Sequence, residues 1–169
     1  MVQADDRSVT MAVAVAGTVL VTAYAVFAAV HILVLNPLLA APGRDLAAIQ
    51  RDLDAAGESL QPFATVAILG TGVALAIFVL VMLARRPDAT PTTALVAYLV
   101  LLTFGTPAYF VASFWAGMAL ADTYAISGAD HSPWAGPLYA VSGLAFLGVV
   151  VIVVAQMMRR QIAAHAERT

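Results

Sequence analysis

The sequence predicts an all-α polytopic membrane protein: an antiparallel bundle of four transmembrane helices, with a short amphipathic helix in the first outer loop. The first supporting observation is composition, because 62% of the 169 residues are hydrophobic and only 11% are charged. A soluble domain carries roughly 25% charged residues, which it needs to cover its surface. The second observation is that the apolar residues form four long runs. The third is that the arginines lie on alternate sides of these runs.

The four apolar runs cover about residues 9–35, 63–84, 94–121 and 134–158, and none contains Asp, Glu, Lys or Arg. Each is long enough to cross a hydrocarbon core of about 30 Å, which takes about 20 helical residues. The strands of a membrane β-barrel alternate apolar and polar residues, whereas these runs are apolar on every face. We therefore predict four spanning helices within a single domain, residues 1–169.

The distribution of arginine predicts the orientation of the spans. Six of the eight arginines precede the first run, separate the second from the third, or follow the fourth: Arg7, Arg85, Arg86, Arg159, Arg160 and Arg168. The loop at 36–62 holds Arg44 and Arg51, and the loop at 122–133 holds none. Because cytoplasmic loops carry the excess of basic residues, we expect a multi-pass protein of the cell membrane with both termini in the cytoplasm. The lack of lysine and the abundance of Ala, Val and Leu indicate a prokaryotic source.

The first outer loop contains a helical pattern. Apolar residues recur there at three- and four-residue spacing: Leu46, Ile49, Leu53, Ala56 and Leu60. This spacing forms one stripe along a helix, so we predict a helix of about three turns within residues 44–60. We interpret it as a cap over the mouth of the bundle or a helix at the membrane interface. A partner-binding or substrate-gating helix is the alternative.

The second loop, at 85–93, is short and contains Pro87 and Pro91. It predicts an antiparallel hairpin of the second and third spans. Thr90 or Thr92 is expected to cap the third span, because a threonine side chain can accept a hydrogen bond from the first turn and proline fits the first helical position.

The third run is interrupted by Thr103-Phe104-Gly105-Thr106-Pro107. A proline within a helix removes one backbone donor and frees the carbonyl four residues earlier, which a threonine hydroxyl can satisfy. We predict a kink that faces the bundle interior, with Phe110 and Phe114 beside a cavity. The candidate ligand-binding residues are Tyr24, His31, Thr103, Thr106, Pro107, Tyr109, Phe110 and Phe114.

His31 is the one side chain within the runs that titrates near neutral pH. A rise of about 1.5 Å per residue places it near the outer boundary, where we expect water to reach it. We interpret it as an interfacial side chain with one hydrogen bond; a ligand to haem or metal and a proton relay remain alternatives. A metal site on the outer face would use His31, Asp122, Asp130 and His131, because carboxylates and imidazoles bind divalent metals.

Two short segments resemble the anthrone-oxygenase-like membrane family: the loop that follows Asn36-Pro37, and Trp134 with the Leu-Tyr-Ala-Val sequence at 138–141. The resemblance implies four spans and a helical first loop. It covers only these residues. The polar residues of that family at the end of the third span are replaced here by Ala-Gly-Met-Ala-Leu-Ala at 116–121, so the resemblance does not assign the chain to the family.

The sequence favours a non-catalytic role, because it contains no catalytic or cofactor motif. The chain also has no cysteine, which excludes disulfides, Cys–zinc sites and iron–sulfur clusters. Our first expectation is an accessory or scaffolding subunit of a membrane complex, or a self-associating bundle. Small residues that let helices approach closely agree with it: Gly70, Gly72, Ala74, Ala76, Gly136, Ser142, Gly143 and Gly148.

Two alternatives remain open. The chain could bind a lipid or other apolar ligand in a cavity near Pro107, and a bound lipid or quinone is then the expected small molecule. It could instead be a membrane oxidoreductase or carry a metal site on the outer face. The expected partners are the lipid bilayer and other membrane subunits or further copies of the chain, with no nucleic acid.

Overall fold

The computed structural model describes residues 2–166, and this part of the chain is helical without strands. The elements in chain order are α1 (Val2–Val30), the π-helical segment η1 (His31–Leu35), α2 (Asn36–Ala40), α3 (Leu46–Ala56), α4 (Pro62–Arg85), α5 (Pro91–Thr103), α6 (Gly105–Tyr124), the 3-10 turn η2 (Pro133–Ala135) and α7 (Gly136–Ala166). The predicted all-α architecture is confirmed.

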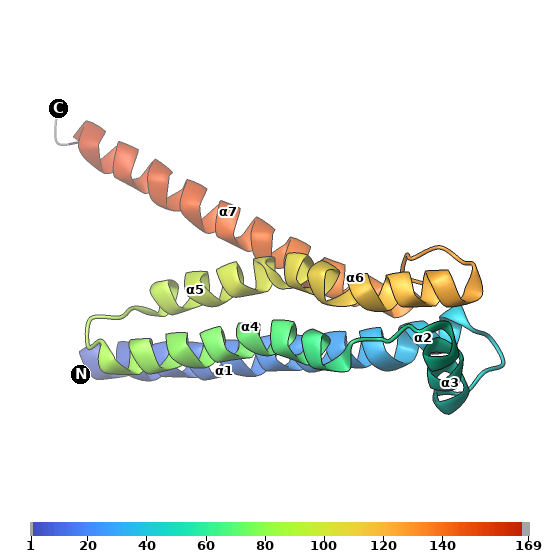
Figure 1. The fold of residues 1–169 in the computed structure, drawn as a ribbon. Helices are drawn as coiled ribbons and strands as arrows, with labels where there is room; N and C mark the ends of the chain where they lie inside the picture. Colours follow the sequence, from blue (N-terminus) through green and yellow to red (C-terminus); the bar gives the residue numbers. More distant parts are fainter. Residues whose placement is uncertain (1, 167–169) are drawn as a thin grey trace.

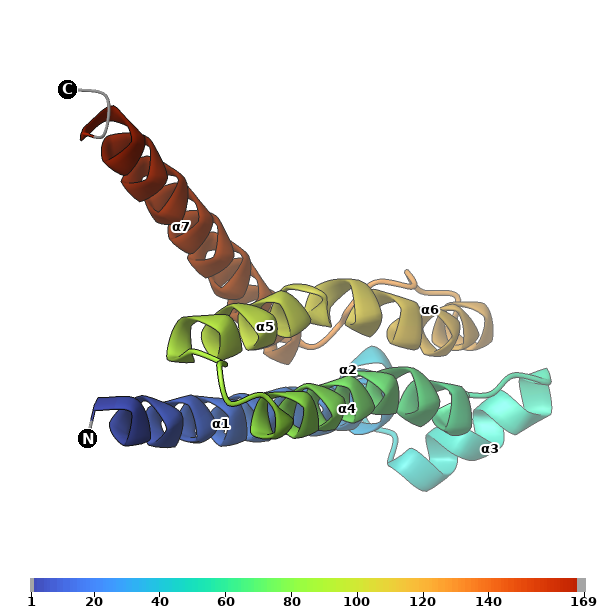
Figure 2. The ribbon, with the colours of Figure 1, turned by 90° about the vertical axis from the view of Figure 1, so that its left-hand side faces the viewer.

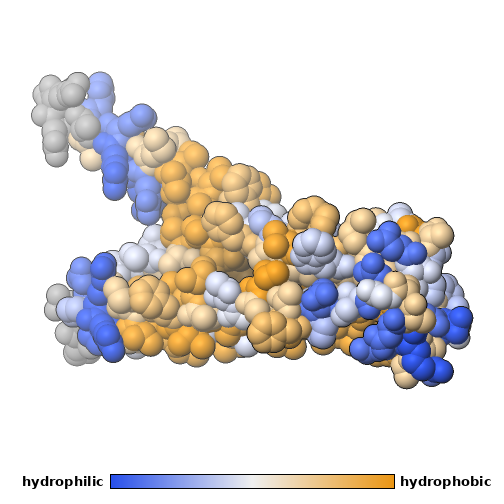
Figure 3. Space-filling model, in the orientation of Figure 1, coloured by the Kyte–Doolittle hydropathy of each residue, from blue (hydrophilic) through white to orange (hydrophobic). Residues whose placement is uncertain are grey.

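Four helical stretches are long and apolar enough to cross a membrane: Asp6–Ala40, Pro62–Arg85, Pro91–Tyr124 and Pro133–Ala163. Each contains one of the predicted spans and extends beyond it at both ends, because helical hydrogen bonding continues past the last apolar residue. On the face drawn in Figure 3, hydrophobic residues occupy most of the middle of the molecule, and hydrophilic residues gather toward its ends. The chain is therefore a multi-pass membrane protein.

α1 packs most extensively against α4 and α5, while α4 also contacts α6 and α5 contacts α7. The start of α1, the end of α7 and the loop at 86–90 lie at one end of the molecule, which we call the terminal end (Figures 1 and 2). α3 and the loop at 125–132 lie at the opposite end, the α3 end.

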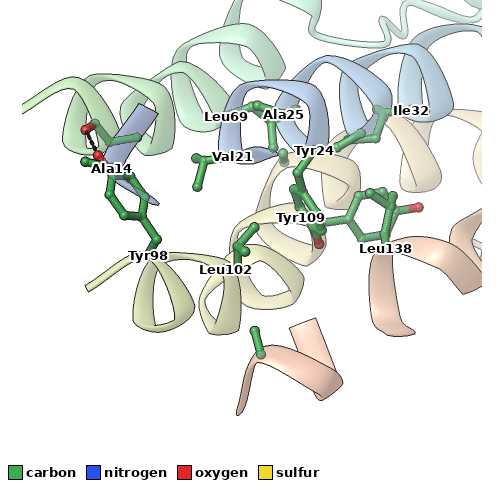
Figure 4. Packing of buried hydrophobic residues seen from close by; sticks show 14 of the residues in the cluster. Ala14, Val21, Tyr24, Ala25, Ile32, Leu69, Tyr98, Leu102, Tyr109 and Leu138 are labelled. Carbon is green, nitrogen blue, oxygen red and sulfur yellow. Dashed lines mark hydrogen bonds between the residues drawn. The ribbon is translucent and has the colours of Figure 1, made fainter. Parts of the chain in front are cut away.

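Small residues let the spans pack closely, as is usual in membrane bundles. Alanines fill much of the buried core: Ala14, Ala28, Ala76, Ala94, Ala112 and Ala116. At Gly17 of α1 the approach is closest, because a Cβ there would overlap the ring of Tyr98 from α5. The Tyr98 hydroxyl lies 2.8 Å from Thr18 Oγ1 and donates to the Ala76 carbonyl at 3.1 Å. Tyr98 thus joins α5 to α1 and α4 (Figure 4).

α3 packs against the last turns of α6 and lies across that end of the bundle. Its buried residues Ile49 and Leu53 pack against Ala119 and Leu120 of α6. The three-turn helix predicted within 44–60 is therefore present between residues 46 and 56, and its contacts favour the interpretation as a cap over the bundle mouth. Its ends follow from local chemistry. Asp45 accepts a hydrogen bond at the first turn, and the glycine after the last turn has a φ of 75°, a conformation that disfavours side chains with a Cβ.

The hairpin between α4 and α5 also follows the prediction. Thr90 is the N-cap of α5, and its hydroxyl accepts a hydrogen bond from the Thr93 N–H at 3.2 Å. Pro91 occupies the first helical position. The second loop therefore ends at the expected residue, because proline needs no backbone acceptor at that position.

The third span is interrupted at Phe104, which separates α5 from α6 and has a ψ of 0°. The interruption agrees with the prediction from the sequence, but the predicted orientation does not. Pro107 is exposed on the bundle surface, and the side chains of Phe110 and Phe114 are 62% and 47% exposed. The prediction that these three residues face an interior cavity is therefore wrong. Alanines on the opposite face of α6 allow α4 to approach, which leaves the bulky aromatic residues facing lipid.

α7 leaves the bundle in its second half. A Cβ at Gly148 would lie 3.2 Å from Leu99 Cδ1 of α5, so this glycine permits a close contact between α7 and α5. Beyond it the helix diverges from the other spans in both views (Figures 1 and 2). The exposed apolar side chains of this half are Val150, Val151, Val153, Val154, Met157, Met158 and Ile162. They require lipid or another membrane protein as their surroundings.

Candidate functional site

A π-helical turn begins at His31, near the α3 end of α1. The Asn36 N–H donates to the His31 carbonyl, five residues earlier, where an α-helix would use the residue four positions earlier. Pro37 supplies the physical reason, because its ring would clash with the Leu33 carbonyl in a regular helix and it has no N–H to donate. A wider π-helical turn avoids the clash and does not require an N–H at Pro37. Such turns occur frequently at functional sites.

The His31 side chain is completely buried, with 0% exposure. The prediction of a water-accessible interfacial histidine is therefore wrong. The rise along α1 indicated the depth of the residue, but it gave no information on α6, whose Tyr109 bonds to the ring, or on η2, which contacts η1. A buried ionisable group within a membrane span is uncommon and is a candidate for function.

Tyr109 of α6 connects His31 to the surface. Its hydroxyl lies 2.9 Å from His31 Nδ1 and donates a hydrogen bond to Asp130 Oδ1 at 2.6 Å. The tyrosine is 1% exposed, whereas Asp130 lies on the exposed loop. The imidazole and phenol rings also meet edge to face, with centroids 5.6 Å apart. A continuous polar chain therefore runs from an exposed carboxylate to a buried imidazole.

Two further contacts fix the loop that carries Asp130. Tyr139 of α7 donates to Asp130 Oδ2 at 2.6 Å, so each carboxylate oxygen accepts from one phenol. The Asn36 side-chain oxygen accepts from the backbone N–H groups of His131 and Ser132, at 2.7 and 3.3 Å. The loop is thus bonded to α2, α6 and α7 within three consecutive residues.

A second polar group lies deeper, where α1, α6 and α7 meet. Ser142 Oγ donates to the Tyr24 hydroxyl at 3.3 Å and accepts from the Thr106 N–H at 3.0 Å. That N–H belongs to the first turn of α6 and has no partner within its own helix, so a residue of α7 satisfies it. A Cβ at Gly105 would lie 2.7 Å from the Tyr24 ring, which explains why a glycine occupies the interruption.

Two buried atoms of these groups make no hydrogen bond of good geometry: His31 Nε2 and Thr106 Oγ1. The Ser132 backbone carbonyl lies near the His31 ring, and the Tyr24 hydroxyl lies near Thr106. Most buried polar atoms in proteins are paired. Unpaired atoms in a single polar region therefore call for an explanation, and a ligand or a water is the usual one.

An apolar pocket of about 340 Å³ lies beside Tyr24, at the interruption of the third span. Its walls come from α1, α4, α5 and α6: Val21, Tyr24, Ala25, Ile68, Leu69, Thr71, Gly72, Leu75, Leu101, Leu102, Phe104, Gly105 and Ala108. Leu75 and Phe104 at its edge are exposed, so the pocket opens toward lipid. Its volume is within the lower part of the range of small-molecule sites, about 300–1,000 Å³.

The sequence-predicted ligand residues separate into four groups. Tyr24 lines the pocket, whereas His31, Thr106 and Tyr109 belong to the polar groups beside it. The Thr103 hydroxyl bonds to the carbonyl of Leu99 within its own helix. The others, Pro107, Phe110 and Phe114, face outward.

The residues named for a metal site do not gather. Within residues 2–166, no group of three or more His, Cys, Asp or Glu side chains is placed to hold a metal ion. Asp130 is bonded to two tyrosines, and the His131 ring lies 2.9 Å from the Ser127 carbonyl. Asp122 is exposed.

Sequence reasoning missed Asn36, Tyr139 and Ser142 as parts of the site. Two signals were available for them. The Asn-Pro pair at 36–37 lies inside a helical span, where proline requires a local adjustment. Polar side chains within an apolar run tend to find partners inside the bundle, and both Tyr139 and Ser142 are such residues.

The chain was compared with known proteins by family, by sequence and by structure. No family model, curated protein or solved structure matches it.

Proposed function

We propose that the protein binds the hydrocarbon chain of a membrane-soluble molecule, such as a lipid or a quinone, in the pocket beside Tyr24. The pocket itself supports this proposal, because apolar residues of four helices surround it and its edge opens toward lipid. An apolar wall offers an incoming chain dispersion contacts and no charged group to desolvate. The helix interruption at Phe104 supplies the space, since α6 starts again on a different course.

Glycine 72 allows a direct test. It lines the pocket, and nothing lies within 4 Å of a Cβ built on it. We therefore expect Gly72→Leu to fill the pocket without disturbing the bundle. Gly70→Leu is the matched control, because it lies on the same helix with equal space around it but does not line the pocket.

The probe is a fatty acid with a photoreactive diazirine in mid-chain, added to the protein in nanodiscs. After irradiation, mass spectrometry should locate the label on pocket residues of α1 and α4. Labelling there should fall at least tenfold in Gly72→Leu and stay unchanged in Gly70→Leu. Equal labelling of both variants, or label spread evenly over the lipid-facing surface, would contradict the proposal.

A second candidate function is favoured by α7. The exposed, divergent half of this helix supports the role of a subunit in a larger membrane assembly or a self-associating bundle.

Because the chain has no cysteine, single introduced cysteines report contacts between copies without background. Val151 of α7 is 66% exposed and Val19 of α1 is 63% exposed. Val151→Cys should form an intermolecular disulfide in oxidised membranes if copies meet along α7, and Val19→Cys should not. Equal cross-linking of both would remove this support.

A further inference from the structure

The directions of the hydrogen bonds around Tyr109 determine the tautomer of His31. A carboxylate only accepts hydrogen bonds, and a phenol has one proton to donate. Tyr109 donates that proton to Asp130 at 2.6 Å. Its oxygen can therefore only accept from His31 Nδ1, which lies 2.9 Å away. Nδ1 must then carry a hydrogen, and a neutral imidazole keeps its lone pair on Nε2.

This lone pair lies in an enclosed position. His31 is 0% exposed, and Nε2 makes no hydrogen bond of good geometry with the described residues, although the Ser132 backbone carbonyl lies near the ring. The titratable groups around the ring are Asp130 and Tyr109, while Tyr139 faces the far oxygen of Asp130. The His131 ring bonds to the Ser127 carbonyl instead. In metal sites and catalytic triads, a carboxylate that orients one imidazole nitrogen prepares the other to accept a proton, a hydrogen bond or a metal.

We propose that Tyr109 and Asp130 act as positioning residues that make His31 Nε2 a buried acceptor for one O–H donor. Two sources can supply this donor: water that enters beneath the loop at 125–132, or the hydroxyl head group of a molecule whose chain occupies the pocket. The second source rests on the proposed function. A metal is not favoured, because no group of three or more ligating side chains surrounds this position in residues 2–166.

Tyr24 in the pocket wall and His31 lie seven residues apart along the first span, a rise of about 10 Å. Ala28, Ala112 and Tyr109 are buried in the same cluster as Tyr24. A hydroxyl head group whose chain occupies the pocket would have to pass between these side chains to reach His31.

The first experiment measures the tautomer. The protein is labelled with ¹⁵N-histidine in nanodiscs, and His31→Gln identifies the signals of His31 by their loss. We expect a protonated Nδ1 and an unprotonated Nε2 in the wild type at neutral pH. Tyr109→Phe should abolish this preference, because Nδ1 loses its acceptor. Tyr139→Phe is the matched control: it removes one bond to Asp130 without touching His31 and should leave the tautomer unchanged. A wild-type tautomer with hydrogen on Nε2 would overturn the proposal.

The second experiment identifies the donor. Farnesol offers a hydroxyl on an apolar chain, and farnesyl methyl ether offers the same chain without a donor. A hydroxyl ligand should move the His31 Nε2 signal upfield with farnesol and not with the ether. If Nε2 already shows the upfield shift of a bonded acceptor without either compound, and farnesol leaves it unchanged, water is the donor. An Nε2 signal of a free lone pair under all three conditions overturns the proposal.

The two proposals fail in distinguishable ways. Competition of farnesol and its ether with the photoreactive fatty acid reports chain binding in the pocket. If both compete but the Nε2 signal stays that of a free lone pair, only the inference about His31 falls. If neither competes, the pocket proposal falls together with the hydroxyl source. The Nε2 signal then decides whether water is the donor. An upfield shift supports an acceptor that binds water, and the signal of a free lone pair overturns the inference about His31.

Discussion

At the scale of residues, close contacts between the helices depend on single glycines. Gly17→Ala should destabilise the protein by about 1–3 kcal/mol, the usual cost of an overpacked core. The added Cβ overlaps the Tyr98 ring, and that ring is held in place by bonds to Thr18 and Ala76. Gly70→Ala should be neutral or stabilise by up to about 1 kcal/mol through helix propensity, because nothing lies within 4 Å of its Cβ. Thermal unfolding in detergent measures both. Equal stability of the two variants would contradict the packing argument.

The Asn36 side chain holds the loop that carries Asp130. Its side-chain oxygen accepts from two backbone N–H groups, at His131 and Ser132. Asn36→Ala leaves both donors without their partner, and each unpaired buried group costs about 1–3 kcal/mol. Hydrogen exchange at 130–132 should therefore accelerate strongly. Asn36→Asp keeps an acceptor oxygen and should preserve slow exchange. Equally fast exchange in both variants would mean that the carboxamide does not hold the loop.

At the scale of elements, the packing of α3 against α6 can be tested without changing the spans themselves. Leu53 is 2% exposed and packs against the end of α6, while Leu46 on the same helix is 37% exposed. Leu53→Ala should cost about 2–5 kcal/mol of local packing, whereas Leu46→Ala should cost little. The expected result is faster hydrogen exchange in residues 46–56 of Leu53→Ala and unchanged exchange in Leu46→Ala. Equal exchange in the two variants would contradict the packing argument.

Elements were also the level at which sequence reasoning was most successful. The apolar runs predicted all four spans, the stripe at 46–60 predicted α3, and Thr90 with Pro91 predicted the start of α5. These features depend on local hydrogen bonding and on the length of the apolar runs, and both can be read from neighbouring residues in the sequence. The face that α6 turns inward was not predictable in the same way. It depends on how far the helix rotates at Phe104, and Pro107 defines a break without defining that rotation.

At the scale of the whole molecule, the site depends on contacts between distant segments. Tyr24, His31 and Tyr109 were identified from the sequence because polar groups within apolar runs need partners. Their mutual contacts were not, since Tyr109 and His31 lie 78 residues apart. The burial of His31 depends on contacts of η1 with α6 and η2, which come from distant parts of the sequence. No local periodicity contains that information, and an unpaired Nε2 is visible only in the folded chain.

The orientation of the whole molecule in the membrane follows from charge. Among the described residues, the segments at the terminal end contain Arg7, Arg85, Arg86, Arg159 and Arg160, while the loops at the α3 end hold more Asp and Glu than Arg. Because basic residues are retained in the cytoplasm, we expect the terminal end inside and the α3 end outside. In the cysteine-free chain, Ser59→Cys should react with a membrane-impermeant maleimide in intact cells, and Asp88→Cys should react only after permeabilisation. The reverse pattern would place Asp130 and the loop over His31 in the cytoplasm. Any O–H donor that reaches His31 as water would then come from the inner aqueous phase.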